Sequence, residues 1–292
     1  MQGGRGGGGL RRLAAAKVNL ALHVTGRRPD GYHELDTLAV FAEFGDAVTV
    51  APAQTIELSI GGPFAAHAPD RADNLAWRAA VLLREVAGTS QGARIHINKA
   101  IPAGAGLGGG SADAAAALLG LNELWRTGLE CDQLAALALK LGADVPMCLF
   151  GRALRARGIG EAIEPFAGLP PLALVLVWPG VALDTGAVFA ALERRENPPI
   201  PEPPASFAGT AEIADWLARC RNDLEPSAAW QAPVVADVMR GIEAADGCLL
   251  ARMSGSGSAC FGLFAAIEEA EAAAAAIAGA HPGWWAQATL AR

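Results

Sequence analysis

One glycine-rich stretch, Ile101 to Ala117, constrains this chain more than any other, because it places five glycines between a proline and an alanine-rich run. Glycine permits positive φ angles and lets backbone N–H groups approach a ligand closely. The alanine-rich run predicts a helix beginning near Ser111, whose first N–H groups and dipole favour an anion. A flexible linker is the plain alternative, but linkers seldom lead into a strong helix former. The stretch therefore predicts a phosphate-binding loop.

Two common phosphate motifs can be compared with this loop. A Walker loop needs Lys and Ser/Thr directly after its last glycine, where this chain has Ser111 and Ala112. The dinucleotide pattern G-x-G-x-x-G is present from Gly104 to Gly109, but it requires a parallel βαβ unit. Residues 94–99 instead alternate polar and apolar side chains, and a second helical pattern at 134–141 follows. We interpret the dinucleotide match as a coincidence of glycine content.

Length and composition narrow the class of protein. A chain of 292 residues allows about two domains, and its longest apolar run, Leu172–Trp178, is far shorter than the roughly 20 residues of a membrane helix. Neither a membrane span nor a secretory signal is expected. Five cysteines without a C-x-x-C pair indicate reduced thiols in a cytoplasm, and the scattered histidines predict no zinc site. A net charge of −7 argues against a nucleic-acid surface.

The pattern of apolar residues predicts the remaining elements. Strands are expected at 15–24, 38–50, 54–60, 94–99 and 172–178, and helices at 74–87, 113–125, 132–141 and 184–192. The prolines between Asn197 and Pro204 predict an irregular connection. Leu249–Phe264 predicts two strands around a Gly-Ser turn, which is either a plain hairpin or a second wall of the anion site.

Three polar features are candidate functional groups. Alternation along the first strand places Lys17 and Asn19 on one face, although a solvated face explains this feature alone equally well. Tyr32 and His33 follow an Asp-Gly turn, where an aromatic ring beside an imidazole suits a heterocyclic ligand or the anchoring of a loop. Asp144 lies between a helix-ending glycine and a proline, where a carboxylate serves either chemistry or a turn.

Five motifs together carry a resemblance to a known family. They are Ala16–Leu20 (A-K-V-N-L), Pro29–His33 (P-D-G-Y-H), Pro102–Ser111 (P-x-G-x-G-L-G-G-G-S), Gly142–Pro146 (G-A-D-V-P) and the Gly-Ser turn Ser254–Cys260. In this order they resemble the motifs of the GHMP kinases. The Asp-Gly-Tyr-His turn resembles the family member that uses a cytidine diphosphate substrate, rather than the mevalonate or homoserine kinases.

The resemblance implies a two-domain α+β GHMP kinase fold with the active site in the interdomain cleft. It implies a glycine-rich disordered arm at 1–10, an N-terminal ATP-binding domain at 11–160 and a C-terminal substrate-side domain at 161–292. The implied protein is a cytoplasmic kinase of the non-mevalonate (MEP) isoprenoid pathway that uses ATP and Mg²⁺. It would phosphorylate the 2-hydroxyl of methylerythritol carried on cytidine diphosphate, as a monomer or homodimer without nucleic-acid or membrane partners.

The resemblance also implies roles for individual residues. Lys17 and Asp144 match the catalytic positions, with Asp144 accepting the hydroxyl proton and touching the substrate. The remaining substrate positions are Asn19, Tyr32, His33, Thr185 and Phe189, with the cytosine between Tyr32 and Phe189 and bonded to His33. The ATP positions are Asn74, Lys99, Pro102, Gly104, Gly106, Leu107, Gly108, Gly109, Gly110 and Ser111. Ser111 is the candidate Mg²⁺ ligand, and no other metal ligand is expected.

The chain departs from the family pattern at two positions of the loop. Ala112 stands where many members have a second serine, so a hydroxyl from this position is not expected, and Asp113 stands where asparagine is common. Three other functions remain open from the residues alone. They are a GHMP kinase for mevalonate, homoserine or a sugar, a dinucleotide-dependent oxidoreductase, and a nucleotide-binding module without enzymatic activity.

Overall fold

A computed structural model describes residues 9–292, so most of the arm expected at 1–10 lies outside the described residues, and Leu10 is the first residue of a strand. The strands are β1 (Leu10–Arg27), β2 (His33–Ala53), β3 (Ile56–Gly61), β4 (Gly92–Asn98), β5 (Leu154–Gly158), β6 (Ala162–Pro165), β7 (Leu172–Trp178), β8 (Leu250–Met253), β9 (Cys260–Phe264) and β10 (Trp285–Ala291). The helices are α1 (Leu75–Val86), α2 (Gly109–Trp125), α3 (Cys131–Leu141), α4 (Val145–Phe150), α5 (Thr185–Ala190), α6 (Thr210–Leu217), α7 (Glu225–Gln231), α8 (Val234–Glu243) and α9 (Ile267–Ala280), with a 3-10 turn at Ala65–His67. The α+β class expected from the sequence is confirmed.

Tertiary contacts divide the chain into two units. Unit 1 comprises residues up to Ala15, Gly45–Ala103 and Gly109–Phe150, and unit 2 comprises Ala16–Phe44, Gly104–Gly108 and Gly151–Arg292. The long strands β1 and β2 each contribute to both units, so the units do not follow a single cut along the chain. The domain boundary expected at residue 160 stays a prediction.

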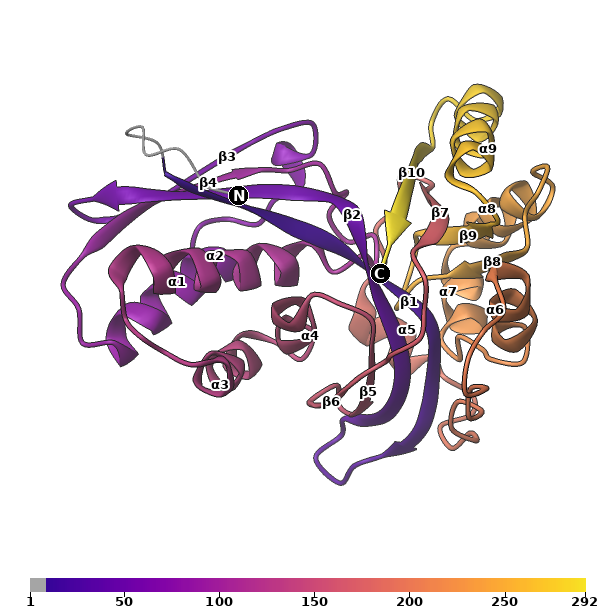
Figure 1. Ribbon diagram of the computed structural model, residues 1–292, viewed down its shortest axis with the longest axis horizontal. Coiled ribbons are helices and arrows are strands. Elements are labelled where there is room, and N and C mark those ends of the chain that lie inside the picture. The colour runs from indigo at the N-terminus through magenta and orange to yellow at the C-terminus, as the bar shows by residue number, and fades with distance from the viewer. Residues whose placement is uncertain (1–8) are drawn as a thin grey trace. The chain divides into compact units, whose positions relative to one another are not determined.

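Unit 1 packs helices against a small sheet (Figure 1). β4 lies between β2, to which it is antiparallel, and β3, to which it is parallel. Along β4 the buried residues Ala93, Ile95 and Ile97 alternate with the exposed Arg94 and His96, as expected for a strand with one wet face. α1 packs on α2, and α2 packs on β4 and α4. The buried alanines of α2 let these neighbours approach closely, and they form much of the core.

Unit 2 is built on an antiparallel arrangement in which β10 pairs with β7, β7 with β9, and β9 with β8. β7 lies between two partners and is buried from Leu172 to Val177, which confirms the burial expected from its continuous apolar run. α8 and α9 pack on these strands (Figure 1). The N-terminal part of β2 pairs with β5, and β5 pairs with β6.

The order of elements after β4 separates this fold from a dinucleotide-binding fold. The glycine-rich stretch leads into α2, α3 and α4 before the next strand, β5. β5 pairs antiparallel with β2 and β6, so within residues 9–292 no strand after the loop pairs parallel to β4. The formal G-x-G-x-x-G match therefore lacks the βαβ context that gives this pattern its meaning.

Candidate active site

The segment Gly104–Gly108 of unit 2 is tied to β1 and to the Gly-Ser turn between β8 and β9. Gly104, Gly106 and Gly108 have φ angles of 69°, 79° and 67°, the left-handed region that favours glycine. Lys17 N–H donates to Leu107 O at 2.9 Å, and Ala259 N–H donates to Ala105 O at 2.9 Å. The Leu107 and Ala105 side chains are buried. The glycines are thus held by anchored neighbours on either side, in a fixed conformation.

The Gly-Ser turn approaches this segment too closely for any side chain. A Cβ built on Gly106 would lie 2.7 Å from the carbonyl oxygens of Ser254 and Gly257. The Ser254 hydroxyl donates to Gly106 O at 3.3 Å. β8 and β9 form an antiparallel hairpin, as expected, and its turn packs directly on the glycine segment.

A chain of buried hydrogen bonds fixes Lys17. Its ammonium donates to Asn19 Oδ1 at 2.7 Å, Asn19 Nδ2 donates to Thr37 Oγ1 at 2.7 Å, and Thr37 Oγ1 donates to Ala21 O at 2.7 Å. Lys17, Asn19 and Thr37 are at most 3 % exposed. The shared strand face of Lys17 and Asn19 is confirmed, but it is buried rather than solvated. Both ends of the Asn19 amide are engaged by protein, so its side chain orients Lys17.

Tyr32 and His33 differ in how the protein holds them. Tyr32 is 60 % exposed, and its backbone N–H donates to Asp30 Oδ1 at 3.1 Å in the turn before β2. The His33 ring stacks on Phe189, with ring centroids 5.0 Å apart and an interplanar angle of 24°. His33 Nε2 is buried and has no hydrogen-bond partner among the described residues. It is therefore placed to bond a ligand.

The protonation state of His33 follows from its surroundings. Burial lowers the pKa of His33, and the positive charges of Arg27 and Arg195 lower it further. The ring is therefore neutral at pH 7, when one ring nitrogen donates and the other accepts. A neutral imidazole of this kind suits the polar edge of a heterocycle.

Thr185 and Phe189 lie on α5, the helix expected to open at Asp184. Asp184 Oδ1 accepts the N–H of Ala187 at 2.7 Å and so caps this helix. The Thr185 hydroxyl is 2.8 Å from that of Ser256 in the Gly-Ser turn. α5 therefore brings Phe189 to His33 and Thr185 to the turn.

The predicted nucleotide residues of unit 1 surround the start of α2. Ser111 is half-buried in the first turn of α2, and Pro102 is buried. Asn74 Oδ1 caps α1, since it accepts the N–H groups of Ala76 and Trp77 at 3.0 and 3.3 Å. The amide oxygen of Asn74 is thus occupied, which leaves its Nδ2 as the donor for a ligand. Pro102 and the glycines act through backbone shape.

Lys99 is the predicted nucleotide residue whose surroundings the sequence did not indicate. Its ammonium pairs with both Asp46 and Asp113, and all three residues are buried. Asp46 stands between glycine and apolar residues in β2, and a carboxylate within a largely apolar strand, three residues after Glu43, was the available signal. Thr37 gave a similar signal, as a polar residue directly before a buried apolar run.

Asp144 lies in the turn after α3, as expected, and is half-buried. α4, which the sequence did not indicate, begins at the next residue, and Cys148 N–H donates to Asp144 O at 3.1 Å. Pro146 falls in the first turn of α4, where proline is tolerated because its missing N–H needs no partner there. The backbone of Asp144 is thus fixed between the end of α3 and the start of α4.

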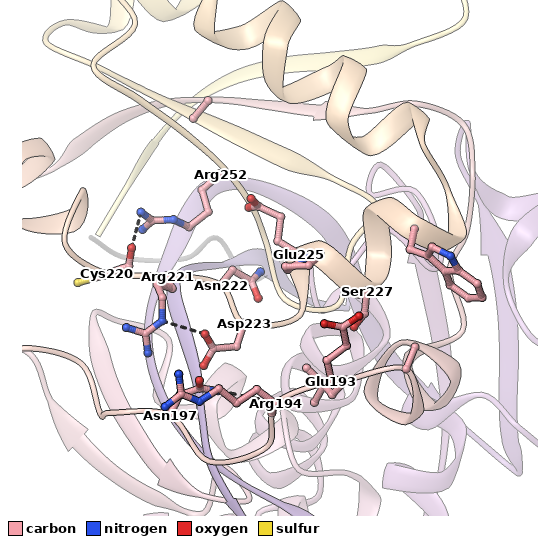
Figure 2. A pocket seen from close by; sticks show the side chains of 15 residues that line it. Glu193, Arg194, Asn197, Cys220, Arg221, Asn222, Asp223, Glu225, Ser227 and Arg252 are labelled. Atoms are coloured by element: carbon pink, nitrogen blue, oxygen red, sulfur yellow. Dashed lines mark hydrogen bonds and ion pairs between the residues drawn. The ribbon is translucent and has the colours of Figure 1, made fainter.

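A cavity of about 970 Å³ in unit 2 is lined by side chains that also brace β1 (Figure 2). Asp223 Oδ2 accepts Val24 N–H at 2.8 Å, and Arg252 donates to Leu20 O at 2.7 Å. Asn222 Nδ2 donates to two carbonyl oxygens at the start of the Gly-Ser turn, at 2.9 and 2.8 Å. The cavity wall therefore supports the strand that carries Lys17 and Asn19.

Comparisons with known proteins show the family of this chain. Residues 74–152 match the GHMP kinases N terminal domain, and residues 209–282 match the GHMP kinases C terminal domain. A relative from Cereibacter sphaeroides, named 4-diphosphocytidyl-2-C-methyl-D-erythritol kinase, is 54 % identical over 94 % of this chain and 96 % of its own length. The chain belongs to the 4-diphosphocytidyl-2-C-methyl-D-erythritol kinase family. The resemblance to GHMP kinases stated from the motifs is confirmed, and so is the expectation of a small-molecule kinase.

Other members and neighbours of this kinase family extend the comparison. A relative of the same name from Dinoroseobacter shibae is 49 % identical over 96 % of this chain and 94 % of its own length. A crystal structure of 4-(cytidine 5'-diphospho)-2C-methyl-D-erythritol kinase has a TM-score of 0.79 at 40 % identity, covering 97 % of this chain and 99 % of that one. A homoserine kinase structure, at 19 % identity and a TM-score of 0.71, shows the shared fold alone. None of the described helices is long and apolar enough to cross a membrane.

Proposed function

We propose that this chain transfers the γ-phosphoryl group of ATP to the tertiary 2-hydroxyl of 4-diphosphocytidyl-2-C-methyl-D-erythritol, giving the 2-phosphate and ADP in the MEP pathway. The 54 % identity to a relative of that name supports the reaction. The observation that supports the substrate from this structure is His33. Its buried Nε2 without a described partner, next to Phe189, suits the edge and face of a cytosine.

Phosphoryl transfer requires the protein mainly to position the reacting groups and to neutralise charge, because its transition state is loose. The substrate 2-hydroxyl oxygen forms a bond to the γ-phosphorus while the bond from that phosphorus to the β,γ-bridging oxygen breaks, and ADP leaves. Asp144 accepts the hydroxyl proton. Lys17, held by Asn19, orients the hydroxyl and stabilises negative charge on the phosphoryl oxygens.

The glycine-rich loop binds the ATP phosphates. Backbone N–H groups of Gly106 to Ser111 bind the β- and γ-phosphates, because glycines leave these groups open and a helix N-terminus favours anions. Mg²⁺ fits this site through the Ser111 hydroxyl, a hard oxygen donor half-buried in the first turn of α2. When bound, the ion neutralises phosphate charge. Asn74 and Pro102 belong to the same nucleotide side of the proposal, and Lys99 lies beneath the start of α2, close to Gly109.

The cytidine part is recognised by unit 2. The cytosine lies between Tyr32 and Phe189 and bonds to His33, and Thr185 and Asn19 complete the substrate side. Tyr32 is largely exposed and therefore available to cover a bound ring. In the structure described here, His33 itself stacks on Phe189, so the entering base shares or replaces this contact.

ADP formation from ATP, measured with and without the cytidine diphosphate substrate, tests the proposal directly. Mevalonate, homoserine and galactose serve as alternative acceptors, and NAD(P) titration tests the oxidoreductase alternative. We expect ADP only with the cytidine compound. ADP formed with another acceptor, or none formed with any, would overturn the proposal.

Replacing the proposed base tests the mechanism. Asp144→Asn keeps the shape of the side chain and removes the proton acceptor, so kcat should fall about 100-fold or more, the usual scale for loss of a general base. The KM for ATP should change little. Asp132→Asn, at an exposed position of α3, is the matched control. An Asp144→Asn enzyme within a few-fold of wild type would exclude the role of base.

The proposal includes a cellular setting. All five cysteines are free thiols, which supports a reducing compartment and hence the cytoplasm. The oligomeric state, monomer or homodimer, and the absence of nucleic-acid partners remain part of the proposal. Size-exclusion chromatography with light scattering tests the first of these.

A further inference from the structure

Three charged side chains are buried together in unit 1 at the base of the nucleotide loop. The Lys99 ammonium lies 2.7 Å from Asp113 Oδ2 and also pairs with Asp46 Oδ2. Asp46 is 0 %, Asp113 3 % and Lys99 5 % exposed. A buried charge is costly unless it is paired and hydrogen-bonded, so this grouping is a specific construction rather than a surface ion pair.

The cluster joins the chain that enters the loop to the helix that leaves it. Asp46 Oδ1 accepts the backbone N–H groups of Ala100 and Ile101 at 2.5 and 2.8 Å. Asp113 belongs to α2, one turn after the helix begins. Lys99 bridges the two carboxylates, and a Cβ built on Gly109 would lie 3.4 Å from its Nζ. The bridge therefore passes directly under the first residue of α2.

The positive charge of Lys99 is balanced by the two carboxylates of this cluster. Burial lowers the pKa of Lys99, but Asp113 and Asp46 more than offset it, so the pKa lies above its ordinary value and the side chain stays protonated. An ammonium with two carboxylate partners cannot turn to a phosphate without leaving a buried carboxylate unpaired. This geometry does not suit a residue that binds ATP with its own charge.

We propose that Asp46, Lys99 and Asp113 form a clamp that fixes the phosphate-binding loop, and that Lys99 and its two partners are positioning residues which do not touch the nucleotide with their side chains. The clamp holds Ala100 and Ile101 against the start of α2, and so sets the spacing of the loop's N–H groups. The inference rests on the proposed function, because it assumes that this loop binds ATP.

Charge-balanced variants separate a clamp from an ATP ligand. Lys99→Met removes the ammonium from the clamp and leaves two buried carboxylates facing each other. At pH 8, above the pKa of about 7 of Asp113, Lys99→Met/Asp113→Asn removes one positive and one negative charge, so the net charge of the cluster equals that of the wild type. Asp113 is within hydrogen-bonding reach of Asp46, so the amide of an asparagine can bridge to Asp46 without Lys99.

The measurement is the Kd of ATP by titration calorimetry without acceptor, together with Tm and the KM values of both substrates. Lys99→Met should weaken ATP binding at least tenfold and lower Tm. The double variant should restore the Kd for ATP to within threefold of the wild-type value and Tm to near the wild-type value. The KM of the acceptor should not change. Asp113→Asn alone keeps the bridge and should bind ATP within threefold of wild type.

Two outcomes would overturn the clamp. One is a double variant whose Tm is restored while its Kd for ATP stays at least tenfold weaker, which would mean that the Lys99 ammonium binds ATP. The other is a Lys99→Met protein that binds ATP like the wild type. If Lys99→Met fails to fold, the double variant still decides. Failure of the proposed function shows separately, as a wild-type protein that binds ATP but forms no acceptor-dependent ADP.

Discussion

Thr37 is the member of the Lys17 hydrogen-bond chain that the proposal does not place against substrate, so replacing its hydroxyl tests the effect of orientation. Thr37→Val keeps the shape and removes the acceptor for Asn19 Nδ2. A buried donor left unsatisfied costs about 1–3 kcal/mol, so Asn19 turns away from Lys17. We expect kcat to fall about tenfold, since a loss of 1.36 kcal/mol in the transition state is tenfold in rate. The KM for ATP should stay unchanged.

Thr49→Val is the matched control, because Thr49 lies on the same strand, β2, in a half-buried position. This variant should keep wild-type kcat. Steady-state kinetics of both variants give the comparison. A Thr37→Val enzyme with wild-type kcat would show that Lys17 does not depend on the hydrogen-bond chain.

His33 carries the second prediction for a single residue. His33→Phe keeps the stack on Phe189 and removes the ring nitrogens, so the KM for the acceptor should rise roughly 3- to 10-fold, the value of one neutral hydrogen bond. Because burial and then Arg27 and Arg195 hold the pKa of His33 below its ordinary 6.5, the wild-type KM should be flat from pH 7 to 8. It should rise only as the pH falls through the lowered pKa, where the ring becomes a cation and neither ring nitrogen can accept a hydrogen bond.

His281→Phe is the control, since His281 also stacks on an aromatic ring, Trp284, but is exposed. It should leave both KM values unchanged. An acceptor KM that rises between pH 7 and 8, or that His33→Phe does not affect, would remove His33 from the substrate site.

At the scale of elements, neighbouring side chains limit which residues fit at the start of α2. A Cβ on Gly109 would lie 3.3 Å from Ile101 Cγ2 and 3.4 Å from Lys99 Nζ, whereas the nearest atom to a Cβ on Gly110 is Leu75 Cδ1 at 3.9 Å. Gly→Ala in an unstrained position stabilises by about 0.4–1 kcal/mol. Gly110→Ala should therefore raise Tm by roughly 1–3 °C. The Tm of Gly109→Ala should be lower than that of Gly110→Ala. Thermal unfolding monitored by circular dichroism decides, and equal Tm values would show that Gly109 is not crowded.

Local patterns predicted most of the described strands but only four of the described helices, α1, α2, α3 and α5, and the differences have physical reasons. α3, α5 and β7 follow their caps and apolar runs, so the sequence located them well. α4 was missed because Pro146 looks like a helix breaker unless it falls in the first turn. β2 runs further at both ends than the pattern at 38–50, because it pairs with β5 at one end and β4 at the other. Pairing between strands that lie far apart in the sequence does not show in a local pattern.

At the scale of the whole molecule, the sequence offered candidate functional residues but not the groups that hold them. The glycines predicted a phosphate-binding loop, and the resemblance to GHMP kinases, carried by short continuous motifs, implied the roles of Lys17 and Asp144. Thr37 and Asp46 were missed, since each meets its partner only after distant strands pair. The same reason explains why the two contact units do not follow a single cut along the chain, since β1 and β2 each contribute to both units.

The free energy of unfolding should depend on pH through the charge of Asp113. Burial, opposed by Lys99 and reinforced by Asp46, raises the pKa of Asp113 from 3.8 to about 7. Below pH 4 both folded and unfolded chains hold this proton. Between pH 4 and 7 only the folded chain does, so stability is lost as the pH rises through this window, by at most about 4 kcal/mol. Asp113→Asn removes this loss and leaves Lys99 balanced by Asp46.

We therefore expect Asp113→Asn to be more stable than wild type at pH 8, with a gain that shrinks steadily as the pH falls to 5. Urea unfolding at pH 5, 6, 7 and 8 measures the difference, and Asp132→Asn, exposed on α3 of the same unit, should show no such trend. A loss of stability at pH 8 would mean that the ionised Asp113 is needed to balance Lys99, and that Asp46 alone does not neutralise it. The sign of the stability difference at pH 8 thus tells whether Asp46 alone neutralises the buried ammonium or whether an ionised Asp113 is also needed.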